Sequence, residues 1–514
     1  MTRPLLGLLY RVVLGAVVLG VVLLAPGSTI ARVDGPVGGF TETRFWTGCR
    51  PGPFHEPPWP DPILDHAPPP EPSQPLNVQI DLDSAVDRPP LLGAGFNLEH
   101  GLWSCPEFRN VFETEILQPF RPAVARVDSG MLPAAPVFLP TADLGPAVYR
   151  SVLSSPVYRD SWRFFDRLNQ AGVRVLLGVW GGPDQFTDDG TRRGRLLPQH
   201  YDDYVRYVVS LVAFLTRHQD LDIWAVTIAN EPDGGDGNQI PPDGLAYVAH
   251  QLAERLPAYG VRLYGPDTAS ADAALDYLPR LLGDPVVAGQ LAAVGFHAYY
   301  PTPDVGATVE YVHRRRPDLP VIVTEYTSFA FGDLDDGQEI RDQLDFTIDI
   351  VDTVLSHYRY GVDAALYWDA VDYLQPGHDA ITKWGLLRGP GMDFARRKHY
   401  YGLGQVLPYL QPGARVLDSR VEGDASVSIL AVQTAAGEPA VFLVNQEEGD
   451  VPLTISLSGD RSAQVTSLVV TRTDIRTDAD PLGRVRLTDG SGNLTLPARS
   501  VTTLVPPDAV TGVV

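Results

Sequence analysis

Between about residue 91 and residue 410 the chain repeats one pattern. A short apolar, β-branched run ends in Gly, Asn, Asp or His, and an amphipathic stretch with helical spacing follows it. Continuous apolar strands that alternate with helices predict a parallel sheet covered by helices, and eight such units predict a closed (β/α)8 TIM barrel over residues 91–410. The eight runs are Leu92–Leu98, Ala123–Asp128, Val173–Trp180, Ile223–Asn230, Val261–Gly265, Ala293–Tyr299, Val321–Thr324 and Ala364–Trp368.

An open, doubly wound sheet is the alternative arrangement for such a pattern. That fold normally has a glycine-rich turn after its first strand, where a phosphate binds. Leu92-Gly93-Ala94-Gly95-Phe96 matches this turn only in part. The start of a barrel strand is the better interpretation of these glycines.

After about residue 410 the chain contains short strands separated by Gly, Asp, Ser and Pro, with too little sequence between them for helices. This pattern predicts a C-terminal all-β sandwich over residues 411–514. Residues 76–90 begin with Leu76–Leu82, which alternates apolar with polar residues, so we expect a strand here that joins the sandwich. The predicted sandwich strands are Ser426–Val432, Pro439–Val444, Leu453–Leu457, Val465–Thr471 and Ser500–Val505.

The N-terminus has the pattern of an export signal. Arg3 and Arg11 precede the apolar run Val12–Ala25, so residues 1–31 are expected to be a signal peptide or an uncleaved N-terminal anchor. Residues 32–75 are rich in proline and are expected to form an extended linker. Both interpretations predict an extracellular or cell-surface protein, in which the two cysteines, Cys49 and Cys105, either pair or stay as separately buried thiols.

Composition excludes several classes of function. The chain has 514 residues, of which 44% are hydrophobic and 20% charged, as in ordinary globular proteins. Its formal net charge of −23 disfavours binding to nucleic acid. The motifs of zinc proteases, phosphate-binding loops and serine esterases do not occur, and two acidic loops lack the ligand spacing of a calcium site. We therefore expect no metal and no cofactor.

Two acidic residues stand where chemistry is expected in a barrel, at the C-terminal ends of strands. Glu231 follows the fourth run in Asn-Glu-Pro, and Glu325 follows the seventh. Their spacing of 325 − 231 = 94 residues equals three βα units of about 31 residues each. Paired carboxylates across a barrel mouth suit cleavage of a glycosidic bond, and their separation decides between retention and inversion.

With these residues the chain resembles the clan of (β/α)8 retaining glycoside hydrolases (clan A) whose catalytic glutamates end strands four and seven. The resemblance covers about residues 91–410, and the segment from His399 into the sandwich is most like families 30 and 39. It implies an O-glycosyl hydrolase with Glu231 as the general acid/base and Glu325 as the nucleophile. The matching motifs are Asn230-Glu231-Pro232, Thr324-Glu325, Arg126, His297-Ala298-Tyr299 and Trp368.

The chemistry of the surrounding residues agrees with these roles. Arg126 and Tyr299 would keep Glu325 ionised for attack. The charge of Glu325, about 5 Å away, would raise the pKa of Glu231, so that Glu231 carries the proton. Asn230 is placed to hydrogen-bond the sugar hydroxyl beside the anomeric carbon.

Other residues are candidates for binding the sugar. Trp368 and Trp180 offer flat apolar faces, although Trp180 could equally fill the core. His297 either binds a hydroxyl or, as we favour, braces a catalytic carboxylate. The sequence therefore predicts a retaining glycoside hydrolase that acts on an oligo- or polysaccharide or a glycoconjugate. The alternative is a non-catalytic carbohydrate-binding or scaffold protein on the same barrel.

Overall fold

The computed structural model describes residues 75–511, except for 85–88, 129–155, 192, 235, 300–301, 329–342, 374–383, 390–392 and 424. The predicted signal or anchor, the linker before Pro75, and Cys49 lie outside the described residues. Cys105 is buried and disulfide-bonded. Among the helices in the described part of the chain, none combines the length and the apolarity that crossing a bilayer requires.

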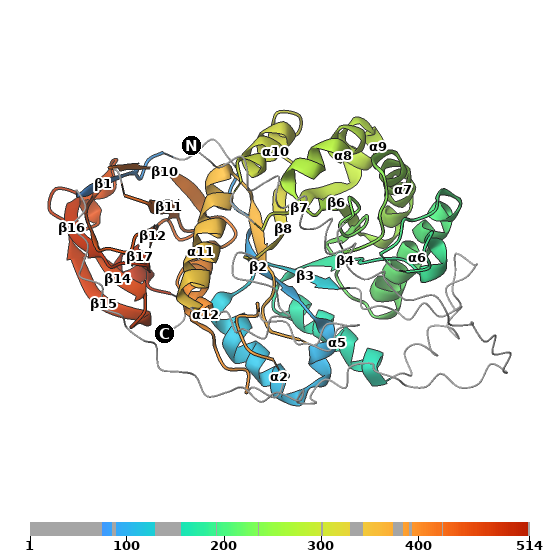
Figure 1. The fold of residues 1–514 in the computed structure, drawn as a ribbon, viewed down its shortest axis with the longest axis horizontal. Coiled ribbons are helices and arrows are strands. Elements are labelled where there is room, and N and C mark those ends of the chain that lie inside the picture. Colours follow the sequence, from blue (N-terminus) through green and yellow to red (C-terminus); the bar gives the residue numbers. More distant parts are fainter. Residues whose placement is uncertain are drawn as a thin grey trace, which may run out of the picture. The chain divides into compact units, whose positions relative to one another are not determined.

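Eight parallel strands close into a barrel in chain order, so the predicted fold class is confirmed (Figure 1). The last strand pairs with the first, with Ala364 opposite Gly93. Almost every strand residue is buried, because helices cover the outside and side chains fill the inside. The strands are β2 (Gly93–Leu98), β3 (Val124–Asp128), β4 (Arg174–Gly178), β5 (Ala225–Thr227), β6 (Arg262–Thr268), β7 (Leu291–His297), β8 (Val321–Tyr326) and β9 (Ala364–Tyr367).

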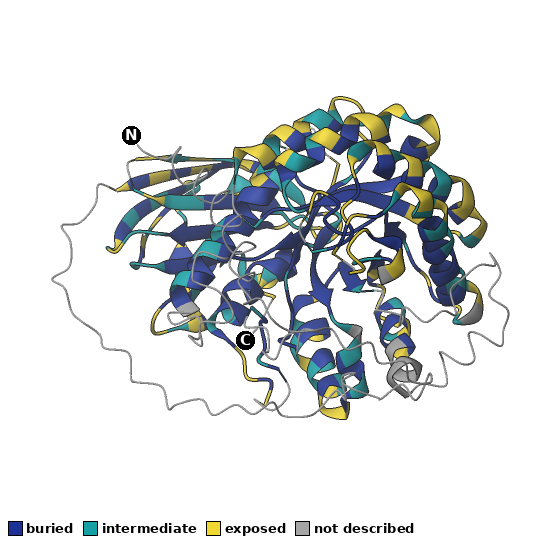
Figure 2. Cartoon of the chain, turned by 45° about the vertical axis from the view of Figure 1, so that its right-hand side comes forward, coloured by how far each residue is buried: buried dark blue, intermediate teal, exposed yellow. Residues whose placement is uncertain are grey.

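The helices around the barrel bury one face and expose the other, as the alternating colours of Figure 2 show. Local capping fixes where some of them begin: Ser270 accepts a hydrogen bond from the backbone of Ala273, and Asp284 from that of Val286 and Val287. The α-helices are α2 (Pro106–Val111), α3 (Gln118–Phe120), α5 (Pro156–Gln170), α6 (Tyr201–Ala213), α7 (Pro242–Arg255), α8 (Ala271–Gly283), α9 (Pro285–Gln290), α10 (Pro303–His313), α11 (Gln343–Tyr360) and α12 (Lys398–Gly404).

The C-terminal strands form two layers that share a core. Strand β10 belongs to both layers. Its residues Arg415–Leu417 pair with β11 in one layer, and Asp418–Glu422 pair with β1 in the other. Strand β1 also pairs in parallel with β13, and its alternating burial matches the period expected of a half-buried strand. The strands are β1 (Leu76–Asp81), β10 (Arg415–Glu422), β11 (Val427–Gln433), β12 (Pro439–Asn445), β13 (Val451–Ser458), β14 (Ser467–Thr473), β15 (Asp478–Arg486), β16 (Ser491–Leu496) and β17 (Ser500–Val505).

The inner layer of the sandwich packs on the barrel. In β11, Ile429 and Ala431 face the sandwich core, whereas Leu430 and Val432 join the apolar core of the barrel. Strand β11 packs against helix α11. One apolar core therefore runs from the barrel into the sandwich, and the boundary proposed near residue 410 divides two modules that are buried against each other.

Candidate active site

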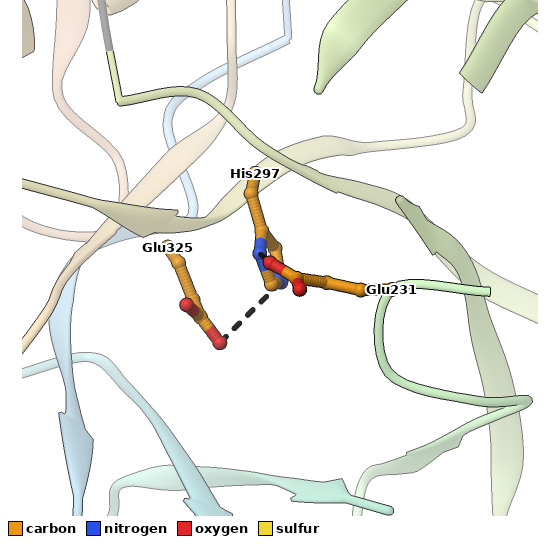
Figure 3. Close-up of side chains that lie close together, drawn as sticks. All are labelled: Glu231, His297 and Glu325. Atoms are coloured by element: carbon orange, nitrogen blue, oxygen red, sulfur yellow. Dashed lines mark hydrogen bonds and ion pairs between the residues drawn. The ribbon is translucent and has the colours of Figure 1, made fainter. Parts of the chain in front are cut away.

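The two glutamates lie at the C-terminal ends of β5 and β8, two barrel strands that β6 and β7 separate. Glu325 is the fifth residue of β8 and is 3% exposed. Glu231 follows β5 by four residues and is 8% exposed, with a positive φ of 40°. Figure 3 shows both carboxylates converging on the imidazole of His297, which ends β7.

The separation between the carboxylates is short. One oxygen of Glu231, one oxygen of Glu325 and a ring nitrogen of His297 all lie within 4.8 Å of one another. Carboxyl groups of retaining glycosidases are about 5–5.5 Å apart, whereas those of inverting enzymes stand about 6.5–9.5 Å apart. The selected oxygens of the two groups are thus nearer to the shorter of these two ranges.

Glu325 receives two hydrogen bonds from groups predicted to flank it. Arg126 Nη1 donates to Glu325 Oε1 at 2.5 Å, and the hydroxyl of Tyr299 donates to Oε2. Arg126 itself is fully buried. The guanidinium is therefore shielded from water, which strengthens its attraction for the carboxylate.

Glu231 is held by different donors. His297 Nδ1 lies 2.8 Å from Glu231 Oε1, and the backbone N–H of Asp236 donates to Oε2. His297 Nε2 lies 3.4 Å from Glu325 Oε1, so the imidazole stands between the two acids. Of the two roles weighed for His297, these contacts match the bracing of a carboxylate.

Arg126 connects the floor of the site. Besides Glu325, its guanidinium donates to Asp267 Oδ2 at 2.9 Å, to Asn97 Oδ1 at 3.0 Å and to Asn230 Oδ1 at 2.5 Å. The side chain of Asn230 also donates to the backbone oxygen of Asp236. Asn230 is only 1% exposed. Its amide is thus fixed by the protein before any sugar arrives.

The protonation of the pair differs from the sequence-based expectation. Burial alone would lower the pKa of His297, but the charges of Glu325, Glu231 and Asp267 raise it to about 9. Burial would raise the pKa of Glu231, but the hydrogen bond and the positive charge of His297 lower it overall. The expectation that Glu231 has the raised pKa is wrong for this arrangement, because a protonated imidazole lies against it.

Glu325 shows the opposite direction. Burial raises the pKa of Glu325, and the charge of Glu231 adds to this effect. The positive charges of His297 and Arg126 act against burial without outweighing it. The buried site therefore shares its protons among three groups, and the imidazole holds one of them at neutral pH.

The two tryptophans lie side by side at the mouth. Trp180 and Trp368 have ring centroids 6.0 Å apart with planes inclined by 40°, and both are partly exposed. The guanidinium of Arg126 lies 4.1 Å from the ring centre of Trp180. Trp180 is therefore not fully buried in the core, and its ring covers the guanidinium of Arg126.

Glu231, His297 and Glu325 have the donor types and the closeness of a metal site. The surrounding charges oppose a cation there. Arg126 already neutralises Glu325, and the raised pKa of His297 means that the imidazole carries a proton in place of a free lone pair. The arrangement suits proton sharing better than metal binding.

Asp267 is a site residue that sequence reasoning missed. It is fully buried in β6 and accepts hydrogen bonds from Arg126, Thr324 and Thr227. The fifth apolar run was ended at Gly265, two residues too early. An acid within two residues of the end of an apolar run, close to the signal used for Glu231 and Glu325, would have found it.

Comparison with known proteins agrees with this architecture. A family model described as glycosyl hydrolase catalytic core matches residues 210–362. A curated relative, "Putative glucosylceramidase 3" of Caenorhabditis elegans, is 20% identical over 295 residues, which cover 54% of this chain and 56% of that protein. The chain thus spans about half the length of this relative.

Solved structures cover more of the chain. A family 30 endoxylanase from Clostridium papyrosolvens C71 has a TM-score of 0.62 and 16% identity, over 84% of this chain and 99% of that one. An endo-β-1,6-glucanase has a TM-score of 0.60 and 16% identity, over 84% and 94%. At such identities the likeness shows the fold. Together with the family model, it confirms the resemblance to (β/α)8 glycoside hydrolases.

Proposed function

We propose that this chain, a (β/α)8 glycoside hydrolase most like family 30, cleaves O-glycosidic bonds with retention of anomeric configuration. One observation carries the proposal: carboxylates from β8 and from the end of β5 approach within 4.8 Å of each other, each with its own set of donors. This separation is the one that double displacement needs. Glu325 is the nucleophile in the proposal, and Glu231 is the acid/base.

In the first step, a Glu325 oxygen forms a bond to the anomeric carbon while the bond from that carbon to the leaving oxygen breaks. The leaving oxygen takes up the proton that Glu231 and His297 hold jointly across their 2.8 Å hydrogen bond. Arg126 and Tyr299 orient Glu325 for this attack. Asn230 lies beside Arg126, where its amide can meet the adjacent sugar hydroxyl.

The charge of Glu325 couples attack to proton release. In the free site, that charge is the largest of those that raise the pKa of His297. When Glu325 becomes a neutral ester, the charge disappears and the imidazole becomes more acidic. Its proton then moves toward Glu231, which supplies the leaving group.

The second step reverses these movements. Glu231 accepts a proton from water, the water oxygen bonds to the anomeric carbon, and the ester bond to Glu325 breaks. The restored charge on Glu325 again favours the protonated imidazole. One set of groups thus serves both halves of the reaction.

The proposed substrate is a neutral oligo- or polysaccharide or a glycoconjugate. The relatives are named as an endoxylanase, an endo-β-1,6-glucanase and a putative glucosylceramidase, so xylosides and glucosides are the first substrates to try. The rings of Trp180 and Trp368 offer apolar faces to a pyranose. We also propose that the protein is exported, as residues 1–31 suggest from their sequence.

Hydrolysis of a panel of nitrophenyl glycosides tests the proposal. Wild type is compared with Glu325→Gln, Glu231→Gln and the control Glu310→Gln, whose side chain on α10 is 64% exposed. Glu325→Gln should lose essentially all turnover on the glycoside that wild type cleaves. Glu231→Gln should keep part of it, because nitrophenolate leaves without protonation. Equal rates in all four proteins would remove the proposal.

The alternative is a carbohydrate-binding protein without turnover. It predicts that wild type binds polysaccharides but releases no nitrophenol or reducing sugar from any member of the panel. The matched pair of acids argues against it, because binding alone needs no second carboxylate at nucleophilic distance from the first.

A further inference from the structure

An open cavity lies among the helices on the outside of the barrel, and neither catalytic acid lines it. Its volume is about 460 Å³, and it lies between the first turns of α6 and α7. That volume is within the range of small-molecule sites, about 300–1,000 Å³. Its lining includes Gln199, Tyr201, Asp202, Asp243, Gly244 and Tyr247.

Two tyrosines form the floor of this cavity. Tyr201 and Tyr247 have ring centroids 6.0 Å apart with planes inclined by 34°. Tyr247 is 45% exposed, so much of its ring is accessible to a ligand. Its hydroxyl donates to Asp202 Oδ1 at 2.8 Å, so the exposed ring is held in one orientation.

Gly244 makes the tyrosine pair possible. A Cβ atom at this position would stand 2.2 Å from the hydroxyl oxygen of Tyr201. Any other residue would therefore push Tyr201 out of its place beside Tyr247. The cavity depends on three residues whose sizes fit one another, unlike an accidental gap between two helices.

The cavity lies at the catalytic end of the barrel. Each helix of a (β/α)8 barrel begins at the end where the preceding strand stops. The chain runs from Trp180, after β4, to the start of α6, and from Glu231, after β5, to the start of α7. Both walls of the cavity are thus the continuations of loops that carry active-site residues.

We propose that this cavity, formed by Tyr201, Asp202, Gly244 and Tyr247, is a second binding site for a neutral saccharide chain. Oriented aromatic faces pack against the C–H faces of pyranose rings, while carboxylates and an amide hydrogen-bond to hydroxyl groups. Among the described lining residues there are two carboxylates and no cation, which disfavours an anionic polymer. A role for the cavity in holding a polymer near the catalytic acids rests on the proposed function. Binding of a saccharide at the cavity is independent of that function.

Affinity electrophoresis in gels that contain xylan or β-1,6-glucan tests this site. All proteins carry Glu325→Gln, so that the polymer is not consumed and the contribution of the active site stays equal. Tyr247→Ala should weaken retardation at least about fivefold on the polymer that retards the parent protein, because it removes the exposed ring. Tyr247→Phe, which keeps the ring, should retain most of it. Tyr311→Ala on α10, which removes a partly buried tyrosine that does not line the cavity, is the control for loss of an aromatic ring elsewhere on the barrel.

Three results would overturn the site: equal retardation of Tyr247→Ala and its parent, no retardation of the parent by either polymer, or retardation that disappears at high salt. The last outcome would indicate a charged partner attracted to Asp202 and Asp243. A separate measurement keeps the proposed function distinguishable. Tyr247→Ala with an intact Glu325 should hydrolyse a nitrophenyl glycoside at the wild-type rate, whether or not the second site exists.

Discussion

Arg126 shows how much of this site depends on single buried residues. It is fully buried and paired with both Asp267 and Glu325. A buried cation is tolerated only where carboxylates and hydrogen bonds compensate its desolvation. The hydrogen bond from Arg126 also fixes the orientation of the Glu325 carboxylate for attack on the anomeric carbon. Tyr299 adds the second donor, from the loop after β7.

The substitution Tyr299→Phe removes only the hydroxyl that donates to Glu325. Tyr299→Phe should lower kcat/KM about 10- to 100-fold, because a hydrogen bond to a charged group contributes about 1.5–3 kcal/mol. Its melting temperature should stay close to that of wild type, since the ring remains. Steady-state kinetics on a nitrophenyl glycoside checks this, with Tyr311→Phe as the control. An unchanged kcat/KM would show that Tyr299 does not assist the nucleophile.

His297 sets the expected pH dependence. Its pKa is raised to about 9, so the imidazole is protonated below that pH and loses the proton above it. If this proton supplies the leaving group, kcat/KM of wild type should fall as pH rises through about 9. In His297→Asn the fall in kcat/KM should occur at a lower pH, because the proton would then be lost at the pKa of Glu231 itself. If kcat/KM falls at the same pH in both proteins, the group that titrates is not His297.

The sequence allowed part of this site to be predicted. Glu231 and Glu325 stood out because each ends an apolar run. Asp267 did not, because the predicted fifth run ends at Gly265, before this acid, and its contact with Arg126 lies 141 positions away in the sequence. The protonation of Glu231 was predicted in the wrong direction, because it depends on an imidazole from another strand.

At the scale of elements, the loop between β5 and α7 positions the acid/base. Its Asp236 donates a backbone N–H to Glu231 and accepts a hydrogen bond from Asn230. Gly237 follows directly, and a Cβ atom there would stand 2.1 Å from the backbone oxygen of Asn230. The loop can close against the strand end only if this residue is glycine.

Gly237→Ala should therefore disturb Glu231 more than Glu325. We expect a larger loss of kcat for glycosides with poor leaving groups, which need the proton, than for activated nitrophenyl glycosides. The control is Gly283→Ala, where a Cβ atom meets nothing within 4 Å. A loss that is independent of the leaving group would argue that the loop does not act through Glu231.

The barrel strands could be predicted from the sequence, whereas strand β15 of the sandwich could not. All eight barrel strands were predicted from apolar runs, because burial on both faces leaves a continuous apolar signal. Strand β15 was missed, because seven of its nine residues are exposed. Its stability comes from pairing with β14, which local composition does not show.

At the scale of the whole molecule, barrel and sandwich should unfold together. Phe442 of β12 belongs to the barrel core and lies 5.9 Å from the ring of Tyr409. The side chain of Thr503 in β17 also hydrogen-bonds to the backbone of Gln405 at 3.0 Å. The sandwich thus completes the apolar core of the catalytic module, as well as forming its own.

Phe442→Ala should destabilise the entire protein by about 3–5 kcal/mol, the cost of emptying a buried aromatic position. A single melting transition at clearly lower temperature is expected, with kcat unchanged well below it. Leu482→Ala in β15, where the side chain is 46% exposed, should leave the transition in place. Two separate transitions in Phe442→Ala would contradict a shared core.

In the proposed mechanism, Glu325 bonds covalently to the sugar. Incubation with activated 2-deoxy-2-fluoro glycosides of the sugar that the protein hydrolyses slows release of the intermediate, and mass spectrometry of a proteolytic digest then locates the adduct. One fluorosugar is expected on the peptide that contains Glu325, and none on the corresponding peptide of Glu325→Gln. An adduct on another carboxylate, or continued hydrolysis with no adduct at all, would contradict it.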